Sequence, residues 1–183
     1  MVGSPFRLAV AVSFSLGLAA CAGSSDDYDF HGPDDSAPAR SARVETPSRP
    51  LQCVPYARER SGILIHGDAG TWWDQSEGKY AHGSQPQVGA VMVLTGYAGP
   101  GRAHVAVVNE IVSDREITVD HANWLDDGAI YKSDPVVDVS SDNDWSEVRV
   151  FNPRTRSWGV RTYLVQGFIG PAPDRDEERV ASN

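Results

Sequence analysis

The chain has 183 residues, of which 40% are hydrophobic and 22% are charged, and its formal net charge is −9. This balance is typical of a soluble globular protein, and the length suits one modest domain with additional segments. The acidic charge and the lack of a basic stripe argue against a nucleic-acid partner, because nothing would neutralise the phosphates.

The first 20 residues have the features of a signal peptide. Arg7 supplies a short positive region, and residues 8–18 form an apolar run that is too short to span a bilayer. Residues 18–21 (LAAC) resemble the lipobox of bacterial lipoproteins, which implies cleavage before Cys21 and attachment of lipid to this residue. The alternative is an ordinary signal peptide that leaves Cys21 free. The two residues after the cysteine carry no evident retention signal, so we expect a lipid-anchored, periplasm-facing protein of the outer membrane.

Composition divides the remainder of the chain into three parts. Residues 21–48 are rich in Ser, Asp, Pro, Arg and Gly, so we expect a flexible tether between the lipid anchor and the domain. The domain is predicted over residues 49–171. The acidic residues 172–183 are expected to form a disordered tail.

A helix is predicted to begin at Cys53. Pro55 fits its first turn, where a missing N–H costs nothing, residues 56–60 are tolerable or good helix formers, and Gly62 is a natural stop. A thiol at this position meets the positive end of the helix dipole and unpaired backbone N–H groups. Both favour the thiolate.

The other elements follow from local patterns. Residues 67–74 predict a second short helix, with Asp68 as its N-cap. Apolar runs rich in β-branched residues predict strands, and a polar stretch predicts a long loop. The strands are residues 88–94, 104–112, 116–121, 147–151 and 160–168, and the loop is residues 124–143. Helices followed by an antiparallel meander indicate an α+β fold in which N-terminal helices pack on an antiparallel β-sheet.

Cys53 is the candidate nucleophile. It is the only cysteine left if Cys21 is acylated, and an exported protein with one thiol has no disulfide to explain it. A buried structural cysteine is the alternative. The position at a helix start, with candidate bases on the strands, favours a reactive thiol.

His104, at the start of a predicted strand, is the candidate general base. A third polar group would fix its tautomer, and Asp120, His121 and Asn123 compete for this role. Strand alternation places His121 on the side of the apolar residues and Asp120 on the other side. We expect the apolar side to face the helices, which favours His121.

Four segments resemble the CHAP domain, the family of cysteine- and histidine-dependent amidohydrolases and peptidases. They are residues 52–58 (QCVPYAR), 86–93 (PQVGAVMV), 104–108 (HVAVV) and 121–124 (HANW). The resemblance implies a papain-like (NlpC/P60-type) domain, with Cys53 as the nucleophile and His104 as the base. The family usually has an acidic residue where this chain has His121, although papain-like relatives use a histidine as the third member.

The resemblance also implies a function. A peptidoglycan hydrolase of the cell envelope would cleave the bond between N-acetylmuramic acid and L-alanine, as an amidase, or a bond in the stem peptide, as an endopeptidase. The backbone N–H of Cys53 and the side chain of Gln52 would hold the oxyanion. Expected partners are peptidoglycan stem peptides and, through the lipid, the membrane, while any envelope regulator stays unknown; no cofactor or metal is implied.

Two other functions compete. One is a non-hydrolytic lipoprotein that binds peptidoglycan or regulates another hydrolase. The other is a zinc hydrolase using Cys53 with His and Asp residues, which the lack of a His-Glu-x-x-His motif or paired cysteines disfavours. His66 and His82 lie in polar loops and are expected on the surface.

Overall fold

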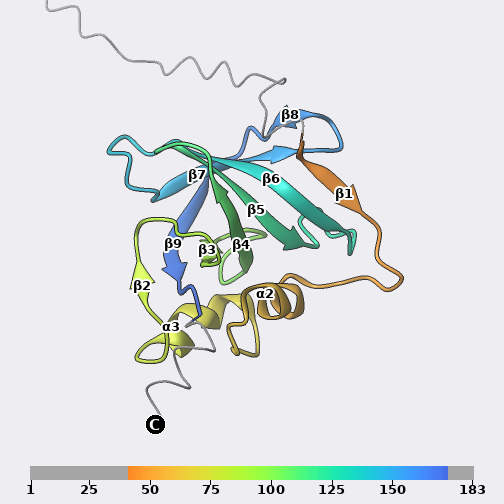
Figure 1. Cartoon of the computed structure of the whole chain (residues 1–183). Helices are drawn as coiled ribbons and strands as arrows, with labels where there is room; N and C mark the ends of the chain where they lie inside the picture. The colour runs from red at the N-terminus through yellow and green to blue at the C-terminus, as the bar shows by residue number, and fades with distance from the viewer. Residues whose placement is uncertain (1–40, 173–183) are drawn as a thin grey trace, which may run out of the picture. The chain divides into compact units, whose positions relative to one another are not determined.

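Six antiparallel strands close into a β-barrel in the computed structural model, which describes residues 41–172 (Figure 1). Around the barrel the order is β6, β5, β4, β3, β9, β7, and pairing of β7 with β6 closes the ring. These strands are β3 (Val91–Thr95), β4 (Ala103–Ile111), β5 (Glu116–Ala122), β6 (Ile130–Asp138), β7 (Glu147–Asn152) and β9 (Tyr163–Ile169). Three short strands extend the sheet: β1 (Arg43–Glu45) on β6, β2 (His82–Gly83) on β9 and β8 (Ser157–Trp158) on β7.

The predicted α+β fold, with papain-like (NlpC/P60-type) packing of N-terminal helices on an antiparallel sheet, is wrong. The structure is mostly β, and the α-helices within residues 41–172 are the short α2 (Cys53–Ser61) and α3 (Trp72–Ser76), with a 3₁₀ turn η1 (Ala69–Thr71) before α3. The fold class was mispredicted because residues 124–143 were expected to form a loop. Strand β6 lies within these residues, and its pairing with β5 and β7 closes the barrel.

Successive side chains along the strands point to opposite faces of the sheet and form two hydrophobic clusters. Side chains on the inner face fill the barrel, whereas those on the outer face of β3 and β4 pack against the helices. The inner set includes Met92, Leu94, Ala106, Val108, Ile117 and Val119, and the outer set joins Val91, Val93, Val105 and Val107 to Ala57, Ile65 and Trp72. The face of β5 that carries Ile117 and Val119 is therefore the barrel interior, and the prediction that it faces the helices is wrong.

The folded part of the chain begins before Arg49. Strand β1, Arg43–Glu45, lies inside the segment predicted as a tether, and it pairs with residues 130–132 of β6. The predicted signal peptide, the lipidation site Cys21, most of the tether and nearly all of the acidic tail fall outside the described residues. No helix among residues 41–172 is long and apolar enough to cross a membrane.

Candidate active site

Helix α2 begins at Cys53, as predicted. Gln52 is its N-cap with extended backbone angles, and the helix ends at Gly62, whose φ is 76° and whose N–H donates to Arg58 O at 3.0 Å. Pro55 occupies the first turn, where its missing N–H leaves no hydrogen bond unmade.

A close backbone approach anchors the start of α2. Leu51 N–H donates to Gly128 O at 3.0 Å, which ties the segment before the helix to the loop between β5 and β6. Gly128 has a φ of +68°, and a Cβ at this position would lie 2.5 Å from Pro50 Cβ. Only glycine permits both the backbone angle and this approach, so Gly128 helps to place Cys53.

The Cys53 thiol is half-buried, and its pKa lies above the usual value. Burial is the largest cause and raises the pKa, whereas the backbone N–H groups of Val105, Val54 and Cys53 itself and the charge of Arg102 lower it. The expected depression of the thiol pKa by the helix start is therefore outweighed by desolvation. The effect of the Val105 N–H indicates that the thiol lies near the start of β4, the strand that carries His104.

His104 and His121 form a hydrogen-bonded pair inside one end of the barrel. His104 Nε2 lies 3.0 Å from His121 Nδ1, and the two side chains are only 2% and 1% exposed. Burial, and then the proximity of His121, lower the pKa of His104 well below its usual value. His104 is therefore a neutral imidazole at neutral pH, and its Nδ1 is the nitrogen left to exchange a proton with the thiol.

Asp134, which the sequence did not single out, extends this pair. Its Oδ2 lies 3.0 Å from His121 Nε2, and its side chain is fully buried. Burial raises the pKa of Asp134 to about 6, although the hydrogen bond and the charge of His121 act in the opposite direction.

Among residues 41–172 no three His, Cys, Asp or Glu side chains are grouped to hold a metal ion.

A β-bulge lies between Asp134 and the residue that pairs with His121. Val119 pairs with Asp134, but His121 pairs with Tyr131, so β6 contributes one more residue than β5 between these pairs. Ser133 lies in this bulge with a φ of 49°. Asp134 lies in the interior because it pairs with inward-facing Val119, and the extra residue allows Tyr131 to face inward opposite His121 as well.

Two aromatic side chains cover the histidine pair. The Trp124 ring centroid lies 5.0 Å from that of His104 and 5.2 Å from that of His121, and the Tyr97 ring lies 5.0 Å from that of His104. The Tyr97 hydroxyl donates to Trp124 O, which links the two. This packing accounts for the burial that keeps His104 neutral.

The other two candidates for the third position lie elsewhere. Asp120 points away from the barrel interior and forms ion pairs with Arg60 and Lys132. Asn123 donates from Nδ2 to Gln52 Oε1 at 3.0 Å and accepts the N–H of Gly128 at 2.7 Å. The structure therefore brings His121, but neither Asp120 nor Asn123, into hydrogen-bond contact with His104.

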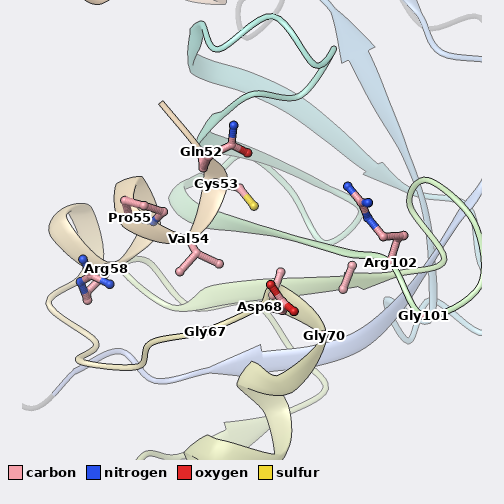
Figure 2. A pocket seen from close by; sticks show the side chains of 12 residues that line it. Gln52, Cys53, Val54, Pro55, Arg58, Gly67, Asp68, Gly70, Gly101 and Arg102 are labelled. Atoms are coloured by element: carbon pink, nitrogen blue, oxygen red, sulfur yellow. The ribbon is translucent and has the colours of Figure 1, made fainter. Parts of the chain in front are cut away.

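The thiol opens into a cleft of about 550 Å³ (Figure 2). Figure 2 shows the Cys53 sulfur pointing into this space, with Arg58 and Arg102 toward opposite ends and Asp68 below. His66 and His82 are both exposed, as predicted, and do not line it. The cleft thus offers both cationic and anionic groups around a nucleophile.

A thiol at a helix start, close to the strand that carries a buried and hydrogen-bonded histidine, is an arrangement that cysteine-dependent hydrolases use. Residues 44–123 match the family model of the CHAP domain, and CHAP domains are typically cysteine- and histidine-dependent amidohydrolases or peptidases. The match supports a CHAP domain here and, in general terms, a function of the peptidoglycan hydrolase or peptidase type. It includes Cys53, His104 and His121 but ends before Asp134. No curated protein and no solved structure matches the chain.

Proposed function

We propose that the protein is a hydrolase of the bacterial cell envelope that cleaves an amide bond of peptidoglycan through Cys53 and His104. The observation that carries this proposal is the pairing of His104 Nε2 with His121 Nδ1 at 3.0 Å at the start of the strand whose Val105 N–H acts on the Cys53 thiol. That pairing commits one nitrogen of His104 and leaves the other for proton transfer with Cys53. The CHAP match over residues 44–123 supplies the substrate class.

The raised thiol pKa and the lowered imidazole pKa indicate that the resting pair is uncharged. When a substrate carbonyl enters the cleft, the sulfur attacks the carbonyl carbon while His104 Nδ1 takes the thiol proton. General base assistance of this kind contributes roughly 10²- to 10⁴-fold in rate. His104, now an imidazolium, gives the proton to the leaving nitrogen as the C–N bond breaks.

Hydrolysis of the thioester completes the cycle. Water gives a proton to His104, its oxygen adds to the thioester carbonyl, and the released sulfur regains the proton. The products are a carboxylic acid, an amine and the original thiol, so atoms and protons balance. Each addition passes through an oxyanion that needs donors nearby.

We expect the Gln52 side chain and the backbone of Cys53 to supply those donors. The N–H of Cys53 lies at the start of α2, and Gln52 Oε1 accepts a hydrogen bond from Asn123 Nδ2 at 3.0 Å. With its oxygen committed in this way, the Gln52 amide nitrogen is left to donate. One such donor contributes about 2.7–4 kcal/mol to transition-state stabilisation in acyl transfer.

The charges of the cleft suit a stem peptide. Peptidoglycan stems carry free carboxylates, and Arg58 and Arg102 line the same cleft as Cys53. We assign the two cations to carboxylate groups flanking the scissile bond, whether the enzyme acts as an amidase or as a stem-peptide endopeptidase. Anchoring through a lipid on Cys21 would hold this site at the periplasmic face of the outer membrane, within reach of the wall.

Digestion of purified peptidoglycan, analysed by mass spectrometry, tests the proposal with Cys53→Ala protein in parallel. Free stem peptides and bare glycan from the wild type alone would identify an amidase, and shortened or uncrosslinked muropeptides would identify an endopeptidase. Equal hydrolysis by both proteins would refute the thiol mechanism. Wall binding by both without any product would instead indicate a non-hydrolytic binding or regulatory protein.

A further inference from the structure

The buried chain of hydrogen bonds His104–His121–Asp134 ends on a carboxylate that touches neither the thiol nor the cleft. The three side chains are 2%, 1% and 0% exposed, and consecutive members are linked at 3.0 Å. Asp134 lies two imidazole rings from the site of proton transfer, so any role in the chemistry must act through both rings.

With Asp134 ionised and His121 neutral, elementary donor and acceptor rules fix the proton positions along this chain. An ionised carboxylate only accepts, so His121 must carry its proton on Nε2 to donate to Asp134. A neutral imidazole has one N–H, which leaves His121 Nδ1 as an acceptor, and His104 must then donate from Nε2. The remaining nitrogen, His104 Nδ1, is therefore unprotonated and can take the proton of Cys53.

We propose that Asp134 is a positioning residue that sets the tautomers of both histidines and thereby makes His104 Nδ1 the base for Cys53. The inference rests on the proposed thiol mechanism. It also accounts for the departure from the usual CHAP pattern, because the carboxylate that this chain lacks at position 121 is supplied from β6, behind His121.

A stability role does not explain Asp134. Its Oδ1 is buried and has no hydrogen-bond partner among the described residues, and His121 is its hydrogen-bond partner through Oδ2. A buried carboxylate with one unpaired oxygen is destabilising relative to a neutral side chain of the same shape. A buried, unpaired carboxylate oxygen in a folded protein calls for an explanation other than stability, and control of the histidine tautomers provides one.

Protonation of Asp134 would reverse the chain. A carboxylic acid donates to His121 Nε2, His121 then donates from Nδ1 to His104 Nε2, and the proton of His104 must move to Nδ1. In this state His104 can no longer accept the thiol proton. Two titratable side chains face the three linked residues. The Tyr131 ring lies 5.4 Å from that of His121, and the Tyr97 ring contacts that of His104. Asp120 and Lys132 form their ion pair on the outer face of the barrel.

Nitrogen NMR on the ¹⁵N-histidine-labelled full chain tests the tautomers directly, because protonated and unprotonated imidazole nitrogens have well-separated shifts. At pH 7.5 the wild type should show protonated Nε2 and bare Nδ1 at both His104 and His121. Asp134→Asn should lose this single arrangement, because either end of the amide can face His121. We expect kcat to fall at least tenfold, with KM unchanged and with no loss of stability.

Asp138→Asn is the matched control, because Asp138 is a buried aspartate on the same strand. Asp138 accepts from Ser140 and pairs with Arg115 at 3.7 Å, so its loss should lower stability but leave the tautomers and kcat unchanged. Wild-type tautomers and wild-type kcat in Asp134→Asn would overturn the proposal.

A pH titration of the wild type provides a second test if Asp134→Asn does not fold. Below pH about 6, the pKa of Asp134, the reversed chain would leave His104 with a bare Nε2, whereas direct protonation of His104 would leave it with two N–H groups. Only the first result supports the proposal. The spectra do not require peptidoglycan turnover, so a failure of the proposed function and a failure of this inference are distinguishable.

Discussion

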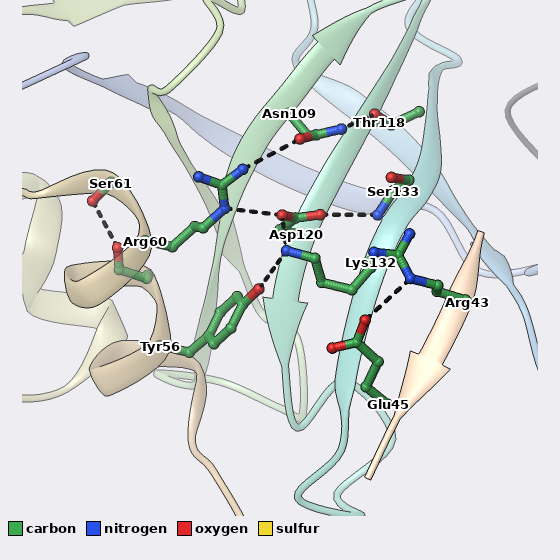
Figure 3. A network of polar contacts seen from close by, with 11 residues as sticks. Arg43, Glu45, Tyr56, Arg60, Ser61, Asn109, Thr118, Asp120, Lys132 and Ser133 are labelled. Carbon is green, nitrogen blue, oxygen red and sulfur yellow. Dashed lines mark hydrogen bonds and ion pairs between the residues drawn. The ribbon is translucent and has the colours of Figure 1, made fainter. Parts of the chain in front are cut away.

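Asp120 and His121 are consecutive residues on β5, and their side chains point to opposite sides of the barrel wall. His121 points inward to His104 and Asp134. Figure 3 shows that Asp120 points outward, toward Arg60 of the helix that carries Cys53. Asp120 Oδ2 pairs with Arg60 of α2 at 3.0 Å and with Lys132 of β6, and its Oδ1 accepts the N–H of Ser133 at 2.9 Å. Asp120 thus connects α2 to the barrel wall and also holds the β-bulge that adjoins Asp134.

Two substitutions at Asp120 distinguish its ion pairs with Arg60 and Lys132 from its hydrogen bond with the Ser133 N–H. Asp120→Asn removes the charge but keeps an oxygen for the Ser133 N–H, so it should lower the free energy of unfolding by about 1–3 kcal/mol and change kcat less than threefold. The estimate is modest because the Arg60 side chain is 45% exposed and solvent screens it. Asp120→Ala also removes the acceptor for Ser133, so kcat should fall as the bulge relaxes. Urea unfolding and peptidoglycan turnover measure the two effects, and equal kcat values in both variants would contradict this division.

The contribution of Asp120 should disappear in acid. Burial alone would raise its pKa, but hydrogen bonds from Lys132, Ser133 and Arg60 outweigh burial and hold the pKa below the usual 3.8. A carboxyl with a lowered pKa stabilises the fold above its unfolded pKa, and this stability is lost as the pH falls through the folded pKa. The stability difference between wild type and Asp120→Asn should therefore be constant above pH about 5 and shrink below pH about 4. A difference that persists unchanged at pH 2 would argue against the ion pairs as its source.

The sequence predicted the elements whose patterns are uninterrupted. Strands β4 and β5 have regular apolar alternation, and α2 has Pro55 in its first turn and Gly62 at its end, so local rules suffice for each. Strand β6 contains Lys132, Ser133, Asp134 and Pro135, which interrupt alternation and are unfavourable in a central strand. Its conformation depends on pairing with β5 and β7, which local sequence does not reveal.

That one omission explains three errors about the fold and the site. Without β6 the sheet stays open, the apolar face of β5 has no barrel interior to line, and Asp134 is assigned to a loop. The pKa of the Cys53 thiol cannot be predicted locally for a related reason, because a helix start is visible in sequence whereas the desolvation of Cys53 depends on packing against β4. His104 and His121 can be singled out as candidates because their types and their positions on regular strands are local properties.

Asn123 should act on the reaction through Gln52. Removing the Gln52 side chain, as in Gln52→Ala, should lower kcat about 10²-fold if its amide stabilises the oxyanion. Asn123→Gly removes the side chain that holds Gln52 Oε1 and adds no strain, because Asn123 has a φ of 60°. We expect a smaller loss of kcat from Asn123→Gly, and the double variant should be no slower than Gln52→Ala alone. Losses that multiply in the double variant would show that Asn123 has a separate role.

The pH dependence of thiol alkylation distinguishes an uncharged Cys53–His104 pair from a preformed ion pair. The sequence has two cysteines, so a Cys21→Ser background leaves Cys53 as the only thiol. Burial raises the pKa of Cys53 and lowers that of His104, so the rate of reaction with iodoacetamide should rise steadily to above pH 9. A rate that is already high and constant from pH 5 upward would show a thiolate–imidazolium pair instead.

Arg102→Ala should shift this alkylation profile to higher pH, because the charge of Arg102 lowers the pKa of Cys53. Arg102 is exposed, so the rate at a given pH should fall less than about threefold, and the difference should vanish in 1 M salt, where the screening length is about 3 Å. Arg156→Ala, which removes an exposed arginine between β7 and β8 that does not line the cleft, is the matched control and should leave the profile unchanged. Equal shifts in the two variants would mean that net charge, and not the position of Arg102 beside the thiol, sets the reactivity of Cys53.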